Sequence, residues 1–147
     1  MITKFTRHVK KIFAGKLLPT DKEIFEFTYK KYYDEFIDFK KGEKNNRQTK
    51  NFIPINTEEI ADHFGVDKDI IFSRFYHYYK DKYDYKKENG TNVSFFLNKL
   101  EKEKHVVHFP YLTSILAKLR YEDEKFNISI LISIFAVIIA FLSFYFK

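Results

Sequence analysis

The sequence has no cysteine and no tryptophan, and only four glycines and three prolines among its 147 residues. Without cysteine the chain has no disulfides, no thiolate ligands for zinc and no cysteine nucleophile. The glycines, at positions 15, 42, 65 and 90, are too scattered to form a glycine-rich loop that holds phosphate. No serine has the flanking sequence of a nucleophile elbow. The composition therefore argues against an enzyme, and we predict no cofactor.

Clusters of metal-ligating side chains are also lacking. His105 and His108 would share one side of a helix, but on the strand that we favour for this segment they point to opposite faces. No third ligand has a recognisable spacing from them. His63, beside Asp62, is typical of an ordinary helix surface. The sequence thus predicts no metal site.

Acidic residues are missing from the first 20 positions, which carry five bases. Of the net charge of +6, only +1 is therefore left for the rest of the chain, which is not the charge pattern typical of a nucleic-acid binder. In residues 1–19 the bases interrupt any apolar run, which excludes a secretory signal, although a mitochondrial presequence would look similar. The segment predicts an amphipathic helix that either lies on an anionic membrane surface or packs on the domain. Its apolar side comprises Ile2, Phe5, Val9, Ile12 and Phe13.

Charge is missing a second time from Phe126 to Phe146, an apolar stretch between Lys125 and Lys147. As a helix it would be roughly 30 Å long, which matches the hydrocarbon thickness of a bilayer. We predict a transmembrane anchor at 126–147; the alternative is a buried core helix. Lys118, Arg120 and Lys125 precede the stretch, and these bases predict a cytoplasmic N-terminus at an inner membrane of bacterial type.

Within this stretch, small residues recur at spacings of four and three, which places them along one face of a helix. Such faces let helices approach closely in lipid, so the pattern predicts a homodimer through the membrane helix. The alternative is that small residues are merely tolerated there. The residues are Ser129, Ser133, Ala136, Ala140 and Ser143.

Residues 20–125 are predicted to form one domain. Thr20 and Glu23 have the spacing of a capping box, which marks a helix start. Aromatic residues at spacings of four and three continue that helix to about Lys40. The polar segment 40–51 predicts a solvated loop, and Phe52–Ile55 an extended edge segment limited by Pro54.

Residues 57–80 predict two helices that cross at a tight turn. Thr57 is the expected cap of the first helix, Gly65 supplies the left-handed turn, and Asp67 caps the second helix. The small residue Ala61, four residues before Gly65, allows the helices to touch. The apolar positions of this segment are Ile60, Phe64, Val66 and Ile71.

In these features the segment resembles the helix-turn-helix superfamily, over about 20 residues. It departs at Arg74, where that family keeps an apolar residue; we expect Phe75 to take over the burial. The match implies a helix pair whose second helix presents an exposed face.

The segments 82–87 and 92–97 flank Asn89-Gly90, a dipeptide that favours a tight hairpin turn with positive backbone angles. This hairpin resembles the wing of a winged helix-turn-helix domain, and 104–109 would add a third strand. The alternative for 92–109 is a helix. Pro110 then opens a helix that runs to Lys125, where it either ends or continues into the anchor. The fold predicted is mainly α with a small β hairpin or meander, plus one C-terminal transmembrane helix.

The resemblance implies that the exposed face of the second helix and the hairpin contact DNA. Asp67 and Asp69 oppose this, because carboxylates repel phosphate, and the groove-facing residues of this helix include no arginine, asparagine or glutamine for bidentate base reading. We therefore predict a membrane-tethered regulator with weak DNA contact; the alternative is a membrane-tethered adaptor that binds a protein partner and no DNA. The candidate DNA-contacting residues are Lys68, Ser73, Tyr76, His77, Lys80, Lys86 and Lys87.

Overall fold

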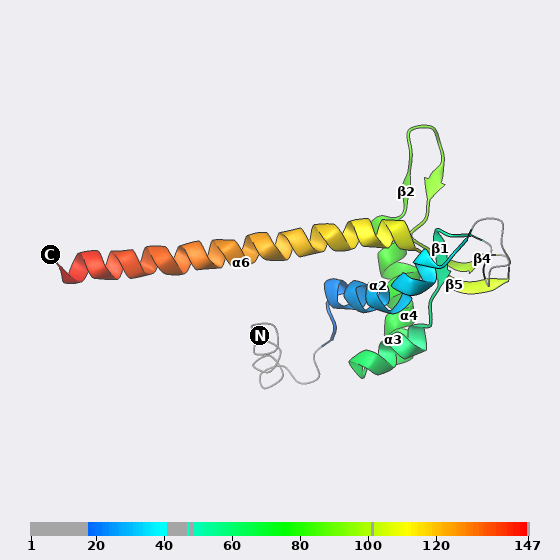
Figure 1. Cartoon of the computed structure of the whole chain (residues 1–147), viewed down its shortest axis with the longest axis horizontal. Coiled ribbons are helices and arrows are strands. Elements are labelled where there is room, and N and C mark those ends of the chain that lie inside the picture. Colours follow the sequence, from blue (N-terminus) through cyan, green and yellow to red (C-terminus); the bar gives the residue numbers. More distant parts are fainter. Residues whose placement is uncertain (1–17, 41–46, 48, 101, 147) are drawn as a thin grey trace.

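The computed structural model describes residues 18–40, 47, 49–100 and 102–146. It consists of a small domain with one very long helix projecting from it (Figure 1). The elements in chain order are α2 (Asp21–Ile37), β1 (Phe52–Pro54), α3 (Thr57–Phe64), α4 (Lys68–Ser73), η1 (Arg74–Tyr79), α5 (Lys80–Tyr83), β2 (Tyr85–Lys86), β3 (Asn92–Val93), β4 (Phe96–Leu100), β5 (Glu103–His108) and α6 (Phe109–Tyr145). Residues 1–17 of the predicted leader 1–19, and residues 41–46 and 48 of the predicted loop 40–51, lie outside the described residues.

Helix α2 begins at the predicted capping box. The side chain of Thr20 accepts a hydrogen bond from the Glu23 amide, and Glu23 accepts one from the Thr20 amide in return. The helix buries Phe25, Thr28 and Tyr32 against the domain core. The predicted aromatic face is confirmed over the length of the helix, because Tyr29 and Phe36 also pack, partly buried, against the core. The helix ends at Ile37, however, and not at about Lys40, so Phe39 lies beyond it.

The polar segment after α2 is not wholly solvated, which corrects the expectation for residues 40–51. Arg47 is 7% exposed and donates hydrogen bonds to Glu35, to the Phe36 carbonyl and to the Thr49 carbonyl. The last turn of α2 contains no basic residue of its own. Arg47 supplies that positive charge from the loop and satisfies a carbonyl near the helix end.

The predicted crossing of two helices is present as α3 and α4. Gly65 adopts the left-handed conformation (φ 62°), and the Val66 amide donates to the Ala61 carbonyl at 3.0 Å. Asp67 caps α4 as expected. The cap of α3, however, is Asn56 and not Thr57: the Asn56 side chain accepts from the amides of Glu58 and Glu59, and Thr57 is already the first helical residue.

The second helix of the pair continues beyond α4 through a π-helical segment, η1, into α5. Ile71, Phe75 and Tyr79, each four residues apart, are all fully buried. In an α-helix every four-residue step overshoots a full turn by about 40°. The wider π turn, with its i to i+5 bonding, offsets this drift and keeps the column against the core. Phe75 is buried as expected, and Arg74 lies beside it on η1.

The strands form two separate sheets, where one hairpin and a third strand were expected. β1, β5 and β4 make an antiparallel sheet in that order, with Val107 opposite Ile53 on one side and Phe96 on the other. The strand at 104–109 is thus confirmed, and the helical alternative for 92–109 is wrong. Pro54 lies at the sheet edge, as predicted.

β2 and β3 form a two-stranded hairpin of their own (Figure 1). Lys82 and Tyr83 end α5 and do not belong to this hairpin, and residues 96–97 belong to β4. Of the Asn89-Gly90 pair only Gly90 has a positive φ, at 83°. The Lys87 amide donates to the Thr91 carbonyl, which closes a loop of residues 88–90 with Gly90 in the left-handed position.

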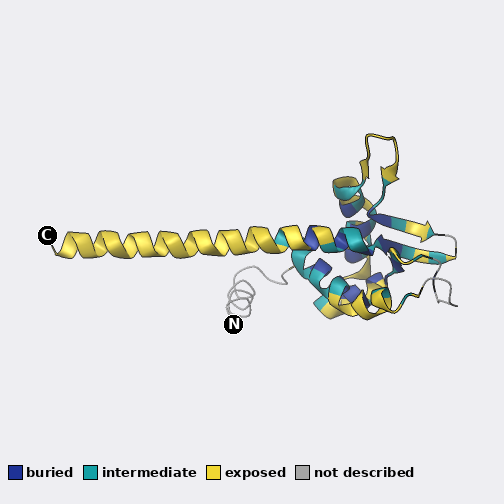
Figure 2. Cartoon of the chain, turned by 45° about the horizontal axis from the view of Figure 1, so that its top comes forward, coloured by how far each residue is buried: buried dark blue, intermediate teal, exposed yellow. Residues whose placement is uncertain are grey.

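Helix α6 begins inside the domain and ends far outside it (Figure 2). His108 caps it and Pro110 lies in its first turn, as expected. Phe109, Leu112 and Leu116 are fully buried in the core, whereas every described residue from Tyr121 onward is exposed. Within the described part of the chain, this one helix is long and apolar enough to cross a membrane, with a mean hydropathy of 2.6 and none of that stretch buried.

Candidate functional site

The candidate DNA-contacting residues of the second helix lie on one side of it. Ser73 and His77 are exposed, whereas Tyr76 and Lys80 are half-buried. Tyr76 stacks on Phe72, with ring centroids 5.4 Å apart, and the Lys80 ammonium lies 5.7 Å from the Tyr76 ring centre. These four residues are brought together as the sequence predicted, as a narrow aromatic and basic strip.

The remaining candidates are not brought to this strip. Lys68 opens α4, with its ammonium 4.0 Å from Glu58, while Lys86 and Lys87 lie on the β2–β3 hairpin at the other end of the helical run. The run from Lys68 to Tyr83 is about 24 Å long at about 1.5 Å per residue. Figure 1 places the hairpin and α3 on opposite sides of the domain. The predicted set is thus divided between two ends.

Carboxylates dominate the corner where α3 meets α4. Glu58 and Glu59 lie in the first turn of α3, Asp67 caps α4 through the Asp69 amide, and Asp62 is exposed. Only Glu59 has a close ion pair, with Lys31 of α2 at 2.5 Å. Lys68 therefore lies among acids, and the corner repels an anionic ligand more than it attracts one.

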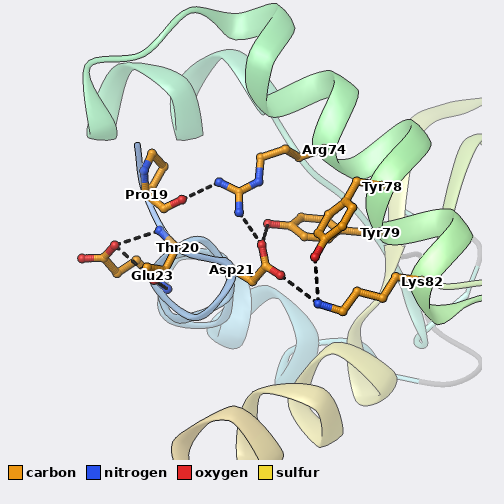
Figure 3. A network of polar contacts seen from close by, with 8 residues as sticks. All are labelled: Pro19, Thr20, Asp21, Glu23, Arg74, Tyr78, Tyr79 and Lys82. Carbon is orange, nitrogen blue, oxygen red and sulfur yellow. Dashed lines mark hydrogen bonds and ion pairs between the residues drawn. The ribbon is translucent and has the colours of Figure 1, made fainter. Parts of the chain in front are cut away.

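A polar network that the sequence reasoning missed fastens the middle of the second helix to the start of α2 (Figure 3). Asp21 accepts hydrogen bonds from Arg74, from the Tyr79 hydroxyl at 3.1 Å and from Lys82 at 3.1 Å. Arg74 also donates to the Pro19 carbonyl. The signal in the sequence was Arg74 itself, a charge at a position where the helix-turn-helix family keeps an apolar residue.

The charges of this network shift the titration of its members. Burial alone would raise the pKa of Asp21, but the hydrogen bonds and charges of Lys82 and Arg74 outweigh it and lower the pKa. Burial raises the pKa of Tyr79 far above its ordinary value. Asp21 is thus an anion and Tyr79 a neutral donor at neutral pH.

A second seam joins α2 to α6 in antiparallel order. Lys22 pairs with Asp123 at 2.5 Å, and Arg120 donates to both carboxylate oxygens of Glu26, at 2.6 and 2.8 Å. Arg120 also lies 5.6 Å from the ring centre of Tyr29. The hydrogen bond from Arg120 lowers the pKa of Glu26. The start of α2 therefore lies alongside the part of α6 that directly precedes its uncharged stretch.

The β2–β3 hairpin projects from the domain across the direction of α6 (Figures 1 and 2). Both of its strands are exposed except at Val93, which is half-buried. Its base is fixed to α6, because the Tyr111 hydroxyl donates to the Tyr83 carbonyl at 3.0 Å and the Tyr111 ring meets Tyr85. The hairpin of β2 and β3, called the arm below, therefore projects from a base that is fixed to α6.

The small-residue stripe of α6 is exposed along its whole length. Ser129, Ser133 and Ser143 donate their hydroxyl protons to carbonyls four residues earlier in the same helix. Their hydrogen bonds are therefore satisfied without a partner. Together with Ala136 and Ala140, these serines give one face of the helix small side chains only. Association of two helices through this face stays a prediction.

Among the described residues, no three or more His, Asp or Glu side chains gather where they would hold a metal ion. His105 has an unusual positive φ of 54° and lies against Phe72, while His108 caps α6. No family model matches the chain, and no curated protein or solved structure matches it either.

Proposed function

We propose that this chain is a single-pass protein of the inner membrane, anchored by the uncharged part of α6, and that its cytosolic domain is an adaptor that holds a protein partner at the membrane. The observation that carries the proposal is the continuity of α6. Its first turns are part of the domain core, and the same helix, 37 residues long in all, continues without a break into the exposed apolar stretch. An exposed apolar surface of that size is stable in lipid and unfavourable in water.

Only a short helical segment of α6 would separate the domain from the bilayer. The last ion pair of the domain seam is at Asp123, and the uncharged stretch begins at Phe126. Three residues of helix span about 4.5 Å. The start of α2 would therefore be at the headgroup layer. The base of the hairpin arm, at Tyr111, would be about 22 Å from the hydrocarbon.

This placement favours a partner on the membrane over chromosomal DNA. The second helix ends at Tyr83, whose carbonyl accepts from Tyr111, so this end of the helix would lie at the height of the arm, about 22 Å from the hydrocarbon. DNA on the exposed face of that helix would meet the carboxylates of the α3–α4 corner, which repel phosphate. The arm points sideways at a fixed height, where a neighbouring membrane protein can meet it.

Anchoring is tested by membrane extraction at alkaline pH. The full chain is expected to stay in the membrane fraction, and a chain ending at Lys125 to leave it. Orientation is tested by a single cysteine, Asn89→Cys, which is unambiguous because the chain has no native cysteine. A membrane-impermeant thiol reagent should label it from the cytoplasmic side only. Extraction of the full chain, or labelling from the opposite side, would contradict the corresponding part of the proposal.

Adaptor function is tested by a photo-crosslinking side chain at Tyr85 in native membranes. A partner on the arm predicts one adduct of discrete mass. The adduct should be lost in Val93→Pro, which removes the pairing between β2 and β3, and should remain in K86E/K87E. An adduct unaffected by Val93→Pro would mean that the arm is not the contact, and a complete lack of adducts would count against an adaptor.

A membrane-tethered regulator with weak DNA contact is the second candidate, favoured by the tight helix pair with Gly65 in its turn. It predicts that the full chain in lipid discs binds DNA with an affinity that falls steeply with salt between about 50 and 200 mM. Charge reversal of Lys68, Lys86 and Lys87 together should abolish that binding. Under the adaptor hypothesis, neither the salt dependence nor the effect of the three substitutions is expected.

A further inference from the structure

Strand β4 forms an open edge of the three-stranded sheet. The strand order is β1, β5, β4, and among the described residues β4 pairs with β5 alone. The His108 amide donates to the Phe95 carbonyl, and in an antiparallel pair only alternate residues bond to the neighbouring strand. Asn98 and Leu100 therefore direct their backbone N–H and C=O groups away from β5. An edge of this kind can accept a further strand.

The opposite edge of the sheet, on β1, is closed by contrast. Pro54 has no amide proton to offer. The Phe52 amide donates to the Thr49 hydroxyl, and the Asn56 amide, just beyond the strand, donates to the Tyr32 hydroxyl. The outward amides of β1 are thus occupied or missing, whereas the outward amides of β4 have no partner within the described part of the chain. The open edge is therefore that of β4.

Two lysines lie directly opposite one another beside this edge. Lys99 of β4 is the register partner of Lys104 of β5, both are exposed, and neither forms an ion pair with any described residue. Glu103 is on the other face of the strand, because neighbouring strand residues alternate. The turn holds the exposed Lys102 and Glu101, which lies outside the described residues. Because like charges opposite each other are unfavourable, this face attracts negative charge.

We propose that β4 binds an extended acidic segment of a protein partner, which joins the sheet as a fourth strand. The residue opposite Lys99 on the new strand would have its side chain on the same face as Lys99. A carboxylate there would lie beside Lys99, with Lys104 about 5 Å further across the sheet. The same lysines repel a second copy of β4, which carries the same charge, and this favours an acidic partner over another copy of this chain.

This surface is separate from the arm. Figure 1 shows β4 and β5 at the end of the domain that faces away from the free part of α6. The edge is therefore accessible whether or not α6 lies in a bilayer, and a soluble protein can reach it. The proposal depends neither on the anchor nor on a partner at the arm.

The test is the affinity of the full chain, in neutral detergent micelles, for a dye-labelled peptide of four Thr-Glu repeats, measured by fluorescence anisotropy. Alternation places all the carboxylates on one face of an extended peptide. One control peptide carries its glutamates in a single block, and another is N-methylated on its backbone amides. Both keep the charge, but the first spreads it over two faces and the second cannot pair with a strand. The alternating peptide should bind about tenfold more tightly than either control.

Two variants of the chain locate the contact. K99E/K104E reverses the charge but keeps two like charges opposite each other, so the thermal midpoint should stay near that of the native chain. Binding should weaken about tenfold or more, whereas the matched reversal K86E/K87E on the arm should leave it unchanged. Asn98→Pro removes an amide that bonds to nothing within the sheet, at an edge position where proline is tolerated. It should abolish binding without lowering the midpoint.

Several results would overturn the proposal. Equal binding of the three peptides would mean attraction of charge without strand addition. Unchanged binding in Asn98→Pro or in K99E/K104E would place the contact elsewhere. Tighter binding of duplex DNA, lost in K99E/K104E, would assign the surface to nucleic acid. A lack of binding to any peptide would mean that the lysines only keep the edge from pairing. If Asn98→Pro lowers the midpoint, the N-methylated peptide still tests the edge in the native chain.

Discussion

At the scale of the residue, His108 connects pH to the start of α6. Its Nδ1 accepts a hydrogen bond from the Tyr111 amide at 3.2 Å, and burial lowers the pKa of His108 below its ordinary 6.5. As the pH falls below 6.5, His108 is protonated in the unfolded chain before it is protonated in the folded chain. The free energy of unfolding therefore falls between pH 6.5 and the lower pKa of the folded chain, and it stays constant at still lower pH. We expect a lower thermal midpoint for the full chain in micelles at about pH 5.5 than at about pH 7.5.

The matched variant is His108→Asn, which keeps a capping oxygen but does not titrate. The difference between its midpoints at the two pH values should be smaller than that of the native chain. The other histidines are the same in both proteins, so comparing the two differences isolates the contribution of His108. Equal differences would mean that the cap does not sense the proton.

Substitution of Asp21 should also change the stability of the domain measurably, because three hydrogen-bond donors from the second helix converge on its carboxylate. Asp21→Asn removes the carboxylate charge that pairs with Arg74 and Lys82. It should lower the free energy of unfolding of the domain by about 2 kcal/mol. Its effect should vanish in acid, since the lowered pKa of Asp21 gives stability that is present above pH 3.8 and lost as the pH falls through the folded value.

Urea denaturation of the full chain in micelles measures the change. The control is Asp34→Asn, an exposed position on the same helix, with an expected change within about 0.5 kcal/mol. If the two variants behave alike at neutral pH, the network is not a stabilising contact.

At the scale of the element, the turn between α3 and α4 depends on Gly65. A β-carbon at a φ of 62° is unfavourable, so Gly65→Ala should cost about 1 kcal/mol. Gly65→Asn should cost less, because asparagine tolerates the left-handed conformation. The midpoints of urea denaturation measure this, provided that the three proteins unfold with the same dependence on urea concentration. The expected order of stability at position 65 is glycine, then asparagine, then alanine. Alanine as stable as asparagine would show that the backbone of the turn relaxes.

The elements with local signals could be predicted from the sequence. Thr20 and Glu23 mark the start of α2 by a reciprocal pair of hydrogen bonds, and Gly65 marks the turn of the helix pair. Asn56 and Thr57 are neighbours that both suit a helix cap. Only the backbone conformation of the folded chain decides that Asn56 remains extended and Thr57 is helical.

The elements that depend on distant partners could not be predicted in the same way. The segment after Gly90 divides between two sheets because β4 pairs with β5, whereas β3 pairs with β2. The π turn at Arg74–Tyr79 results from the need to keep Phe75 and Tyr79 in one core, which periodicity alone does not specify. The separation of Lys68 from Lys86 follows from the same long helical run.

At the scale of the whole molecule, the central feature is that domain and apolar helix share one continuous element. Tight packing of Phe109, Leu112 and Leu116, with ion pairs as far as Asp123, fixes α6 to the domain. No flexible segment separates this packed part from the apolar stretch. Under the proposed anchoring, the domain should turn only together with this helix, and its arm should keep one height and one direction.

This rigidity can be measured by the residual anisotropy of a fluorophore at Asn89→Cys, with the full chain in lipid discs. Inserting Gly-Ser-Gly-Ser between Lys125 and Phe126 should lower the residual anisotropy, because the domain could then turn independently of the disc. Inserting four alanines instead should leave it high, since alanine continues the helix and only lifts the domain by about 6 Å. Equal anisotropy for both insertions would mean that contacts other than α6 fix the domain.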